Sequence, residues 1–171
     1  METSLRRFPK LRLLWLPVVL VLLDQATKYW AVKCLKPRES ISVIGEQVTF
    51  RYLENRGAAW GMLSGKLDVL SILTVILMLF LLYLVSKVPA ERRFLPITVC
   101  LLAIISGAFG NLIDRIWRHH VVDFISFDVI NFPVFNVADI YVTCCTILLA
   151  ILILFKYKEN ELNFLPFFGD N

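Results

Sequence analysis

Four long apolar runs divide this chain, and each is close to the length that a membrane crossing requires. They cover residues 12–31, 67–85, 94–113 and 137–155. About 20 mostly apolar residues suffice for an α-helix to cross the hydrocarbon core of a bilayer. The segments 32–66 and 114–136 connect the first span to the second and the third to the fourth. The pattern predicts a single membrane domain of four transmembrane helices, with both connecting segments on the same side.

The two connecting segments carry β-prone stretches. In residues 47–53, apolar and polar positions alternate with period two, and Gly45 can supply the turn that pairs this stretch with residues 41–44. Residues 121–125 and 132–135 are also β-prone and could join this hairpin in a small sheet. The small residues around Trp60 predict a short interfacial helix or flap. We therefore expect an all-α membrane bundle that carries a small extracytoplasmic β-sheet.

Composition supports a membrane protein and argues against nucleic-acid binding. Of the 171 residues, 58% are hydrophobic and 19% are charged, whereas soluble domains have roughly 45–50% and about 25%. The net charge of +4 comes from basic residues at the ends of apolar runs, which is the distribution that the positive-inside rule produces. The four cysteines form no CxxC motif or Cys/His cluster, so we interpret them as small buried residues.

Basic residues also predict the topology. The two terminal tails and the short loop 86–93 together hold nine, and the two longer connecting segments hold eight that are spread over more residues. Higher density in short loops favours the cytoplasmic side. We expect both termini inside and the segments 32–66 and 114–136 outside.

The stretch from Gly107 to Asp139 is unusually polar for such an apolar chain, because it holds four aspartates and three asparagines. Ionisable groups near membrane depth are costly, so they indicate a functional site. Two of the aspartates, Asp123 and Asp139, lie in similar apolar settings. Paired acids of this kind suit acid–base chemistry with a shared proton. The alternative is that these residues merely form polar loops that cap membrane helices.

The two acids are expected to differ in environment. Asn136 is a good N-cap for the fourth helix and places Asp139 in its first turn, where the helix dipole favours the ionised carboxylate. Asp123, between Val122 and Phe124, has no comparable set of donors in the sequence. Nearby positions supply no lysine or metal ligand that would hold two negative charges together, so close approach should force the acids to share a proton. This chemistry needs no metal and no cofactor.

Residues of other segments could support such a site. Asp24 and Lys28 are four apart on the first helix and can pair, either bracing the site or simply holding two charges together. Gly107, Asn111 and Asp114 share one helix face. The remaining candidates are Gly110, which would allow close backbone approach, Arg115, Asn55 and Gly57, although Asn55-Arg56-Gly57 could equally be an ordinary turn.

Taken together, these motifs resemble lipoprotein signal peptidase, the type II signal peptidase of bacteria. The resemblance covers almost the whole chain and rests on five motifs in order: Asp24 to Lys28, Asn55 to Ala59, Gly107 to Arg115, Val121 to Phe124, and Phe135 to Asp139. It implies a membrane aspartyl protease that cuts prolipoproteins before a diacylglyceryl-modified cysteine.

The resemblance also implies residue roles and partners. The catalytic aspartates of the family correspond to Asp123 and Asp139, and positions that contact substrate or inhibitor correspond to Asn55, Gly57, Asn111, Arg115 and Asn136. The implied protein is a monomer in the bacterial inner membrane. Its implied partners are membrane lipids, diacylated prolipoproteins and the cyclic peptide antibiotic globomycin.

Two other classes of function remain open from the residues alone. A small transporter or proton channel would also place acids in a helical bundle, but it would distribute them along a path, and here they cluster at one membrane face. A non-enzymatic membrane chaperone or scaffold would tolerate the loss of either aspartate.

Overall fold

The computed structural model describes residues 10–38, 40–45, 47–57, 65–130 and 132–165. The long helices are α1 (Trp15–Cys34), α2 (Leu67–Lys87), α3 (Leu95–Arg118) and α4 (Val137–Ile151), which continues as a π-helical turn over Leu152–Lys156. The strands are β1 (Ile41–Ile44), β2 (Val48–Asn55) and β3 (Val121–Phe127). Short 3-10 turns are η1 (Lys10–Leu13), η3 (Arg92–Phe94), η4 (Asp128–Ile130) and η6 (Glu159–Glu161). The predicted flap around Trp60 lies outside the described residues.

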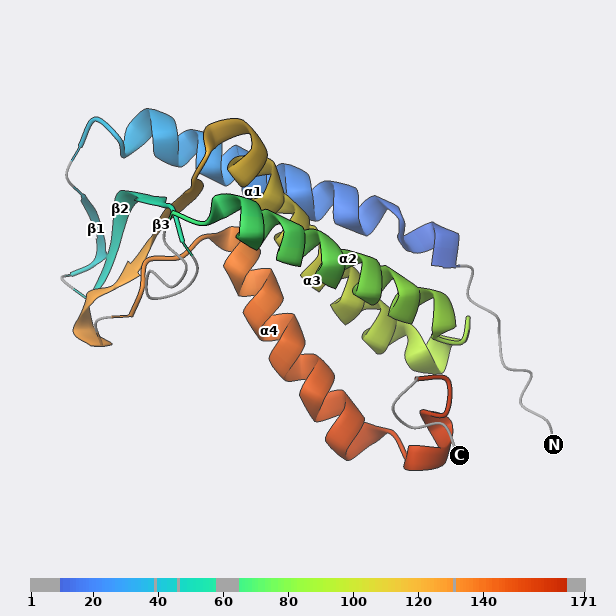
Figure 1. The fold of residues 1–171 in the computed structure, drawn as a ribbon. Coiled ribbons are helices and arrows are strands. Elements are labelled where there is room, and N and C mark those ends of the chain that lie inside the picture. The colour runs from blue at the N-terminus through green and yellow to red at the C-terminus, as the bar shows by residue number, and fades with distance from the viewer. Residues whose placement is uncertain (1–9, 39, 46, 58–64, 131, 166–171) are drawn as a thin grey trace.

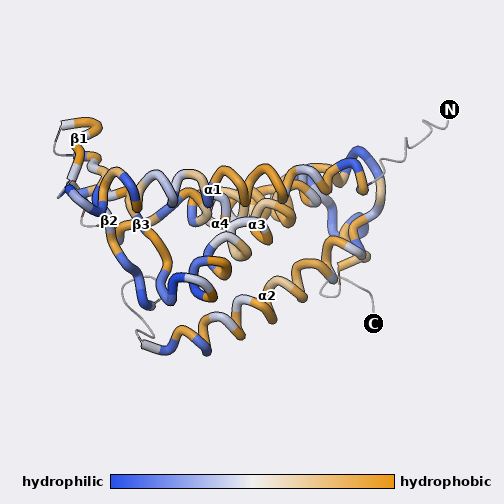
Figure 2. Tube along the Cα trace, turned by 90° about the horizontal axis from the view of Figure 1, so that it is seen from above, coloured by the Kyte–Doolittle hydropathy of each residue, from blue (hydrophilic) through white to orange (hydrophobic). Residues whose placement is uncertain are grey.

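The helices run alternately up and down, and the sheet lies at one end of them (Figure 1). At the other end, Lys10 of η1 donates hydrogen bonds to the carbonyls of Val85 and Ser86 where α2 ends. Hydrophilic residues gather at the two ends, while apolar residues occupy most of each helix (Figure 2). This distribution is the one that a bilayer around the middle of the bundle requires.

Helix α3 is the centre of the bundle. Of the most apolar stretch of this helix, 67% is buried inside the protein, whereas only 11% of the corresponding stretches of α2 and α4 is buried. The outer faces of α2 and α4 therefore present apolar side chains to the surroundings.

Within the described residues, three helices are long and apolar enough to cross a membrane: α2, α3 with the preceding η3, and α4 with its π-helical turn. The chain is therefore a membrane-integral protein. Helix α1 is as long as α4 with its extension, but it carries Asp24 and Lys28, whose side chains are fully buried. The four predicted spans thus correspond to four long helices, three of which have the hydropathy of a span.

Helix α3 extends beyond the apolar run from which the third span was predicted. The third span was predicted to end at residue 113, but the helix continues to Arg118. Hydropathy falls there because the apolar run is followed by Asp114. The side chain of Asp114 is nevertheless fully buried and paired with Arg118 one turn later. Burial of a satisfied polar face sustains the helix where the apolar pattern ends.

Among the described residues, the sheet has three antiparallel strands in the order β1-β2-β3. The predicted hairpin is confirmed, with Gly45 in the turn at a φ of +53°. Residues 121–125 join it as predicted. The second β-prone piece contributes a single bridge, between Phe135 and Ile125.

The sheet is anchored to the end of α1 by aromatic packing. Trp30 lies edge-to-face against Phe50 and Phe124, with ring centroids 5.6 and 6.1 Å away. Val122 and Phe124 belong to one buried apolar cluster with Leu35, just after the end of α1. Because successive side chains of a strand point to opposite faces, the packing of Val122 and Phe124 places Asp123 on the opposite face of the sheet.

Candidate active site

Asp139 lies in the first turn of α4, and the predicted cap is confirmed. The side chain of Asn136 accepts a hydrogen bond from the Asp139 backbone N–H (3.1 Å), and the Asp139 carboxylate accepts one from the Asn136 backbone N–H (3.0 Å). This reciprocal capping box holds the carboxylate rigidly at the helix N-terminus.

Asp123 reaches the same place from β3. Asp123 pairs with Leu53 of β2, and Asn55 pairs with Val121, so Asn55 and Asp123 are diagonal neighbours on one face of the sheet. A bulge in the β2–β3 pairing between Phe50 and Leu53 sets this register. A one-residue slip would turn these side chains to the other face, so the bulge helps to determine where Asp123 points.

Three asparagine amides present their N–H groups to the two carboxylates. The side-chain nitrogen of Asn55 donates to Asp123 (2.9 Å), and that of Asn136 donates to the other oxygen of Asp123 (2.7 Å). The side-chain nitrogen of Asn111, from α3, donates to Asp139 (2.9 Å). Asn136 therefore contacts both acids, through its side chain and its backbone, and the two acids belong to one network.

This arrangement corrects one expectation from the sequence. Asp123 was expected to lack a donor set, yet it accepts two amide hydrogen bonds. It is nevertheless only 1% exposed. Burial, followed by the negative charge of Asp139, raises the pKa of Asp123 to about 7, although the amides of Asn55 and Asn136 oppose the shift. A carboxyl group with this pKa can hold a proton near neutral pH.

Asp24 and Lys28 pair as predicted and form part of a larger buried cluster. The Lys28 ammonium lies 2.9 Å from Asp24 and 3.2 Å from Asp114 of α3. Asp24 also accepts from the backbone N–H of Ala138 (3.1 Å), and Asp114 accepts from that of Val122 (3.1 Å). The cluster thus joins α1 and α3 to the backbone directly before each of the two acids, at Val122 and Ala138.

The position of Lys28 overturns the expectation that no lysine lies near the acids. Its third hydrogen bond goes to the side-chain oxygen of Asn111 (2.8 Å), whose nitrogen donates to Asp139. Lys28 is far from both acids in sequence, so only the packing of α1 against α3 could reveal it.

Two further members of the cluster were not singled out in the sequence. Gln25 donates to Asp24 (3.1 Å) and to the carbonyl of Gly110 (3.1 Å). Arg118 forms an ion pair with Asp114. The i, i+4 spacing of Asp114 and Arg118 was a usable signal for the second of these.

Gly107 and Gly110 lie at helix contacts. A Cβ atom at Gly107 would lie 2.5 Å from the carbonyl oxygen of Ala138, on α4, and one at Gly110 would collide with the Asp24 carboxylate. Only glycine lets α1 and α4 approach α3 this closely at these two positions.

A cavity of about 1350 Å³ opens beside the two acids. Asp123, Asp139, Asn55, Gly57 and Asn111 line it together with Arg115. Its apolar walls come from the sheet, the segment before α4 and α4 itself, among them Leu53, Ile125, Phe127, Phe132, Phe135 and Ile140. The Nε of Arg115 is buried and has no hydrogen-bond partner among the described residues. The cavity thus combines acids, amide donors and a guanidinium with apolar walls, as ligand-binding sites commonly do.

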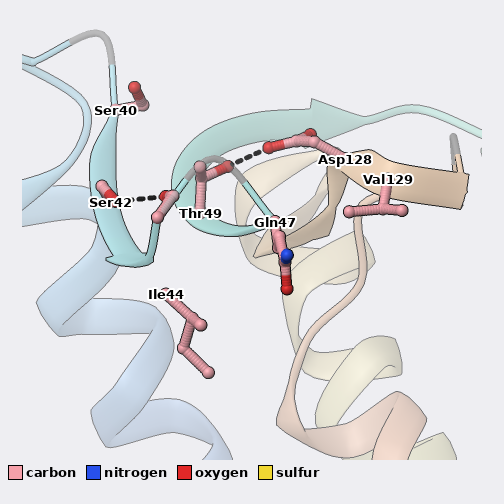
Figure 3. A pocket seen from close by; sticks show the side chains of 8 residues that line it. Ser40, Ser42, Ile44, Gln47, Thr49, Asp128 and Val129 are labelled. Carbon is pink, nitrogen blue, oxygen red and sulfur yellow. Dashed lines mark hydrogen bonds between the residues drawn. The ribbon is translucent and has the colours of Figure 1, made fainter.

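A second hollow, of about 1140 Å³, lies at the β1–β2 turn (Figure 3). Ser42, Gln47 and Thr49 line it, and Thr49 donates a hydrogen bond to Asp128 (2.6 Å). Neither Asp123 nor Asp139 reaches this hollow, so it lacks the acid pair that makes the larger cavity a candidate active site.

The sequence model of the family described as Signal peptidase (SPase) II matches residues 16–155. The chain belongs to the signal peptidase II family. It is 46% identical over 149 residues to a lipoprotein signal peptidase of Clostridium tetani, covering 83% of this chain and 93% of that relative. It is 38% identical over 146 residues to one of Staphylococcus aureus, covering 84% and 88%.

Two solved structures, both described as bacterial membrane enzymes, share the fold. Each superposes with a TM-score of 0.75, at 34% and 32% sequence identity. They cover 88% and 90% of this chain, and the chain covers 91% and 99% of theirs. As a member of the signal peptidase II family, the chain is a protease. This membership favours an enzyme over the channel and scaffold interpretations.

Proposed function

We propose that this protein is an aspartyl endopeptidase that removes signal peptides from prolipoproteins, cutting before a diacylglyceryl-modified cysteine. The observation that carries the proposal is the hydrogen-bonded network of Asp123 and Asp139 beside a large cavity. Family membership and relatives called lipoprotein signal peptidases support the substrate class.

The proposed mechanism uses a water molecule between the two carboxyl groups. Asp139, at the positive end of α4, is the ionised partner and takes a proton from the water as it attacks the scissile carbonyl. Asp123, whose pKa is raised to about 7, holds the proton and donates it to the carbonyl oxygen. Paired carboxyl groups in different environments can divide acid and base roles in this way.

The other cavity residues would bind and orient the peptide. Arg115 offers a guanidinium with an unpaired Nε, and Asn55 and Gly57 border the cavity from the end of β2. The acyl chains of the substrate can remain in the bilayer beside the apolar outer faces of α2 and α4. Peptide inhibitors of the globomycin type would occupy the same cavity.

The proposed setting is the cytoplasmic membrane of a bacterium, with both termini inside and the acids at the outer face. The charge distribution supports this orientation, because basic residues are densest in the termini and the 86–93 loop.

Incubation of the purified protein with a diacylated prolipoprotein tests the proposal. We expect a product shortened by the signal peptide, and the same yield in the presence of EDTA because the acids act without a metal. The matched control is the same precursor without its lipid, which should remain uncut. Equal cleavage of both precursors would contradict the proposed specificity, and no cleavage of the lipidated one would contradict the function.

A further inference from the structure

Lys28 uses its three N–H donors on three different partners. They are the carboxylates of Asp24 (2.9 Å) and Asp114 (3.2 Å) and the side-chain oxygen of Asn111 (2.8 Å). The side chain is fully buried. An ammonium group has three donors and no acceptor, so these contacts satisfy it completely in the charged form. Asp24 lies on α1 itself, so the contacts that join α1 to α3 are those with Asp114 and Asn111, and only the contact with Asn111 leads on to Asp139.

The contact with Asn111 fixes the orientation of that amide. The Asn111 oxygen accepts from Lys28 and from the Asn136 side chain (3.1 Å), so its nitrogen must face Asp139. Without the ammonium, the amide could turn and present its oxygen to the carboxylate. Lys28 thus acts on Asp139 through one intervening side chain.

The charges around the two acids balance only at one state of protonation. The described ionisable groups of the cluster are Asp24 and Lys28 on α1, Asp114, Arg115 and Arg118 on α3, Asp123 on β3 and Asp139 on α4. Four carboxylates therefore face three cations, and a single proton on the acid pair makes the cluster neutral. Tyr141 of α4 interacts with Asp24 but adds no charge at neutral pH. At the rim of the cavity, Glu54 contacts Lys36, Arg56 and His120, and Asp128 contacts Arg51.

We propose that Lys28 is a positioning residue that, through Asn111 and through its charge, holds Asp123 and Asp139 at one shared proton near neutral pH. This inference rests on the proposed function, because the shared proton matters only for acid–base cleavage. It goes beyond bracing, since a brace would affect stability and leave the protonation of the acids unchanged.

The test is the pH dependence of cleavage of a diacylated prolipoprotein by the full-length protein. An acid–base pair gives a bell-shaped profile whose two limbs report its protonations. Lys28→Gln removes a positive charge, so both carboxyls hold protons more tightly, and both limbs should move to higher pH by about one unit or more. Asp24→Asn removes a negative charge from the same cluster, and both limbs should move to lower pH.

The variant Asp24→Asn/Lys28→Gln removes both charges and should return the limbs close to their wild-type positions. The matched control is Lys36→Gln, which removes a surface lysine that is paired with Glu54 and should leave the limbs in place. If Lys28→Gln does not fold, Asp24→Asn tests whether the charge of this cluster sets the protonation of the two acids. Unmoved limbs in folded Asp24→Asn would then overturn the proposal.

Slower cleavage with unmoved limbs in the folded single variants would overturn the role of Lys28 and leave the proposed function intact. Absence of cleavage by the wild-type protein would instead overturn the proposed function. The two failures are therefore distinguishable in the same experiment.

Discussion

At the scale of the residue, three asparagines are held so that each amide can present only N–H groups to an acid. The Asn55 oxygen accepts from the Gly57 backbone N–H (2.9 Å), and the Asn136 oxygen accepts from that of Asp139. Because one end of each amide is occupied, the other end must face a carboxylate. An aspartate at any of these positions would offer no donor when ionised, and the acids would lose a hydrogen bond.

The first prediction concerns Asp123 and the pH dependence of stability. Its pKa is raised in the folded protein to about 7 from 3.8. Between these values the native state binds a proton that the unfolded chain releases, so the free energy of unfolding falls as pH rises from about 4 to about 7. Asp123→Asn removes this dependence. Relative to wild type, the free energy of unfolding of the variant should rise by a few kcal/mol between pH 4 and pH 8. Its Tm should rise by about 2–4 °C for each kcal/mol.

Thermal unfolding in detergent across this pH range checks the prediction. Asp128→Asn is the matched control, because hydrogen bonds from Ser126 and Thr49 lower the pKa of Asp128. The difference in free energy of unfolding between Asp128→Asn and wild type should therefore not shift in favour of the variant between pH 4 and pH 8. A constant stability difference between Asp123→Asn and wild type at all pH values would contradict the burial argument.

The sequence predicted the residue-scale chemistry where it is local, and failed where it depends on packing. The Asn136 cap, the Asp24–Lys28 pair and the shared face of Gly107 and Asn111 follow from spacing along one helix. The amide donors to Asp123 and the contact of Lys28 with Asn111 join different elements. No periodicity within one segment carries that information.

At the scale of the element, α3 organises the site by close contact with α1 and α4. Gly107 allows α4 to approach, and Gly110 leaves room for the Asp24 carboxylate of α1. Small residues at helix contacts are a common means of bringing backbones together within membranes. The same approach brings Asn111, one turn after Gly107, within hydrogen-bond distance of Asp139.

The second prediction is that Gly107→Ala destabilises the protein. The added methyl group would lie 2.5 Å from the Ala138 oxygen and 2.8 Å from a methyl carbon of Val142, so α3 and α4 must move apart. Such overpacking costs typically 1–3 kcal/mol, and cleavage should fall because Asn111 and Asp139 separate. The control is Ser106→Ala, which loses only a bond to the Leu102 carbonyl. Equal Tm values for the two variants would contradict close packing at Gly107.

Hairpin and helix identities were predictable from periodicity, but their limits and register were not. The turn at Gly45 has a sequence signal, whereas the bulge between Phe50 and Leu53 has none in a single strand, because it arises from pairing with β3. Helix α3 outlasts its apolar run because Asp114 is satisfied by partners on other segments.

At the scale of the whole molecule, α1 shows how one helix can carry a polar cluster on its inner side and apolar residues on its outer side. Asp24 and Lys28 are hidden against α3 and α4, while the outer side of α1 exposes Val18, Val19 and Leu22. Buried, mutually satisfied charges are compatible with a bilayer, whereas lipid-facing charges are costly. Hydropathy averaged along the helix cannot distinguish these two cases. This supports the proposal that α1 is a fourth span.

The third prediction is that both termini lie in the cytoplasm and the β1–β2 turn lies outside. Epitope tags at either end should react with antibody only after the cytoplasmic membrane is permeabilised, and a tag inserted at Gly45 should react before. An even number of spans requires the two termini to behave alike. Termini on opposite sides would exclude α1 as a span.

The most direct test of the aspartyl-protease mechanism is cleavage by Asp123→Asn and Asp139→Asn variants that are folded and still bind a peptide inhibitor. Asparagine keeps the shape of aspartate but cannot exchange a proton. The cleavage rate of each variant should therefore fall by at least the factor of about 10²–10⁴ that general acid–base catalysis contributes. The double variant should lose little more, because the pair acts as a unit. Cleavage near the wild-type rate by either single variant, on protein that binds the inhibitor normally, would contradict the aspartyl-protease mechanism.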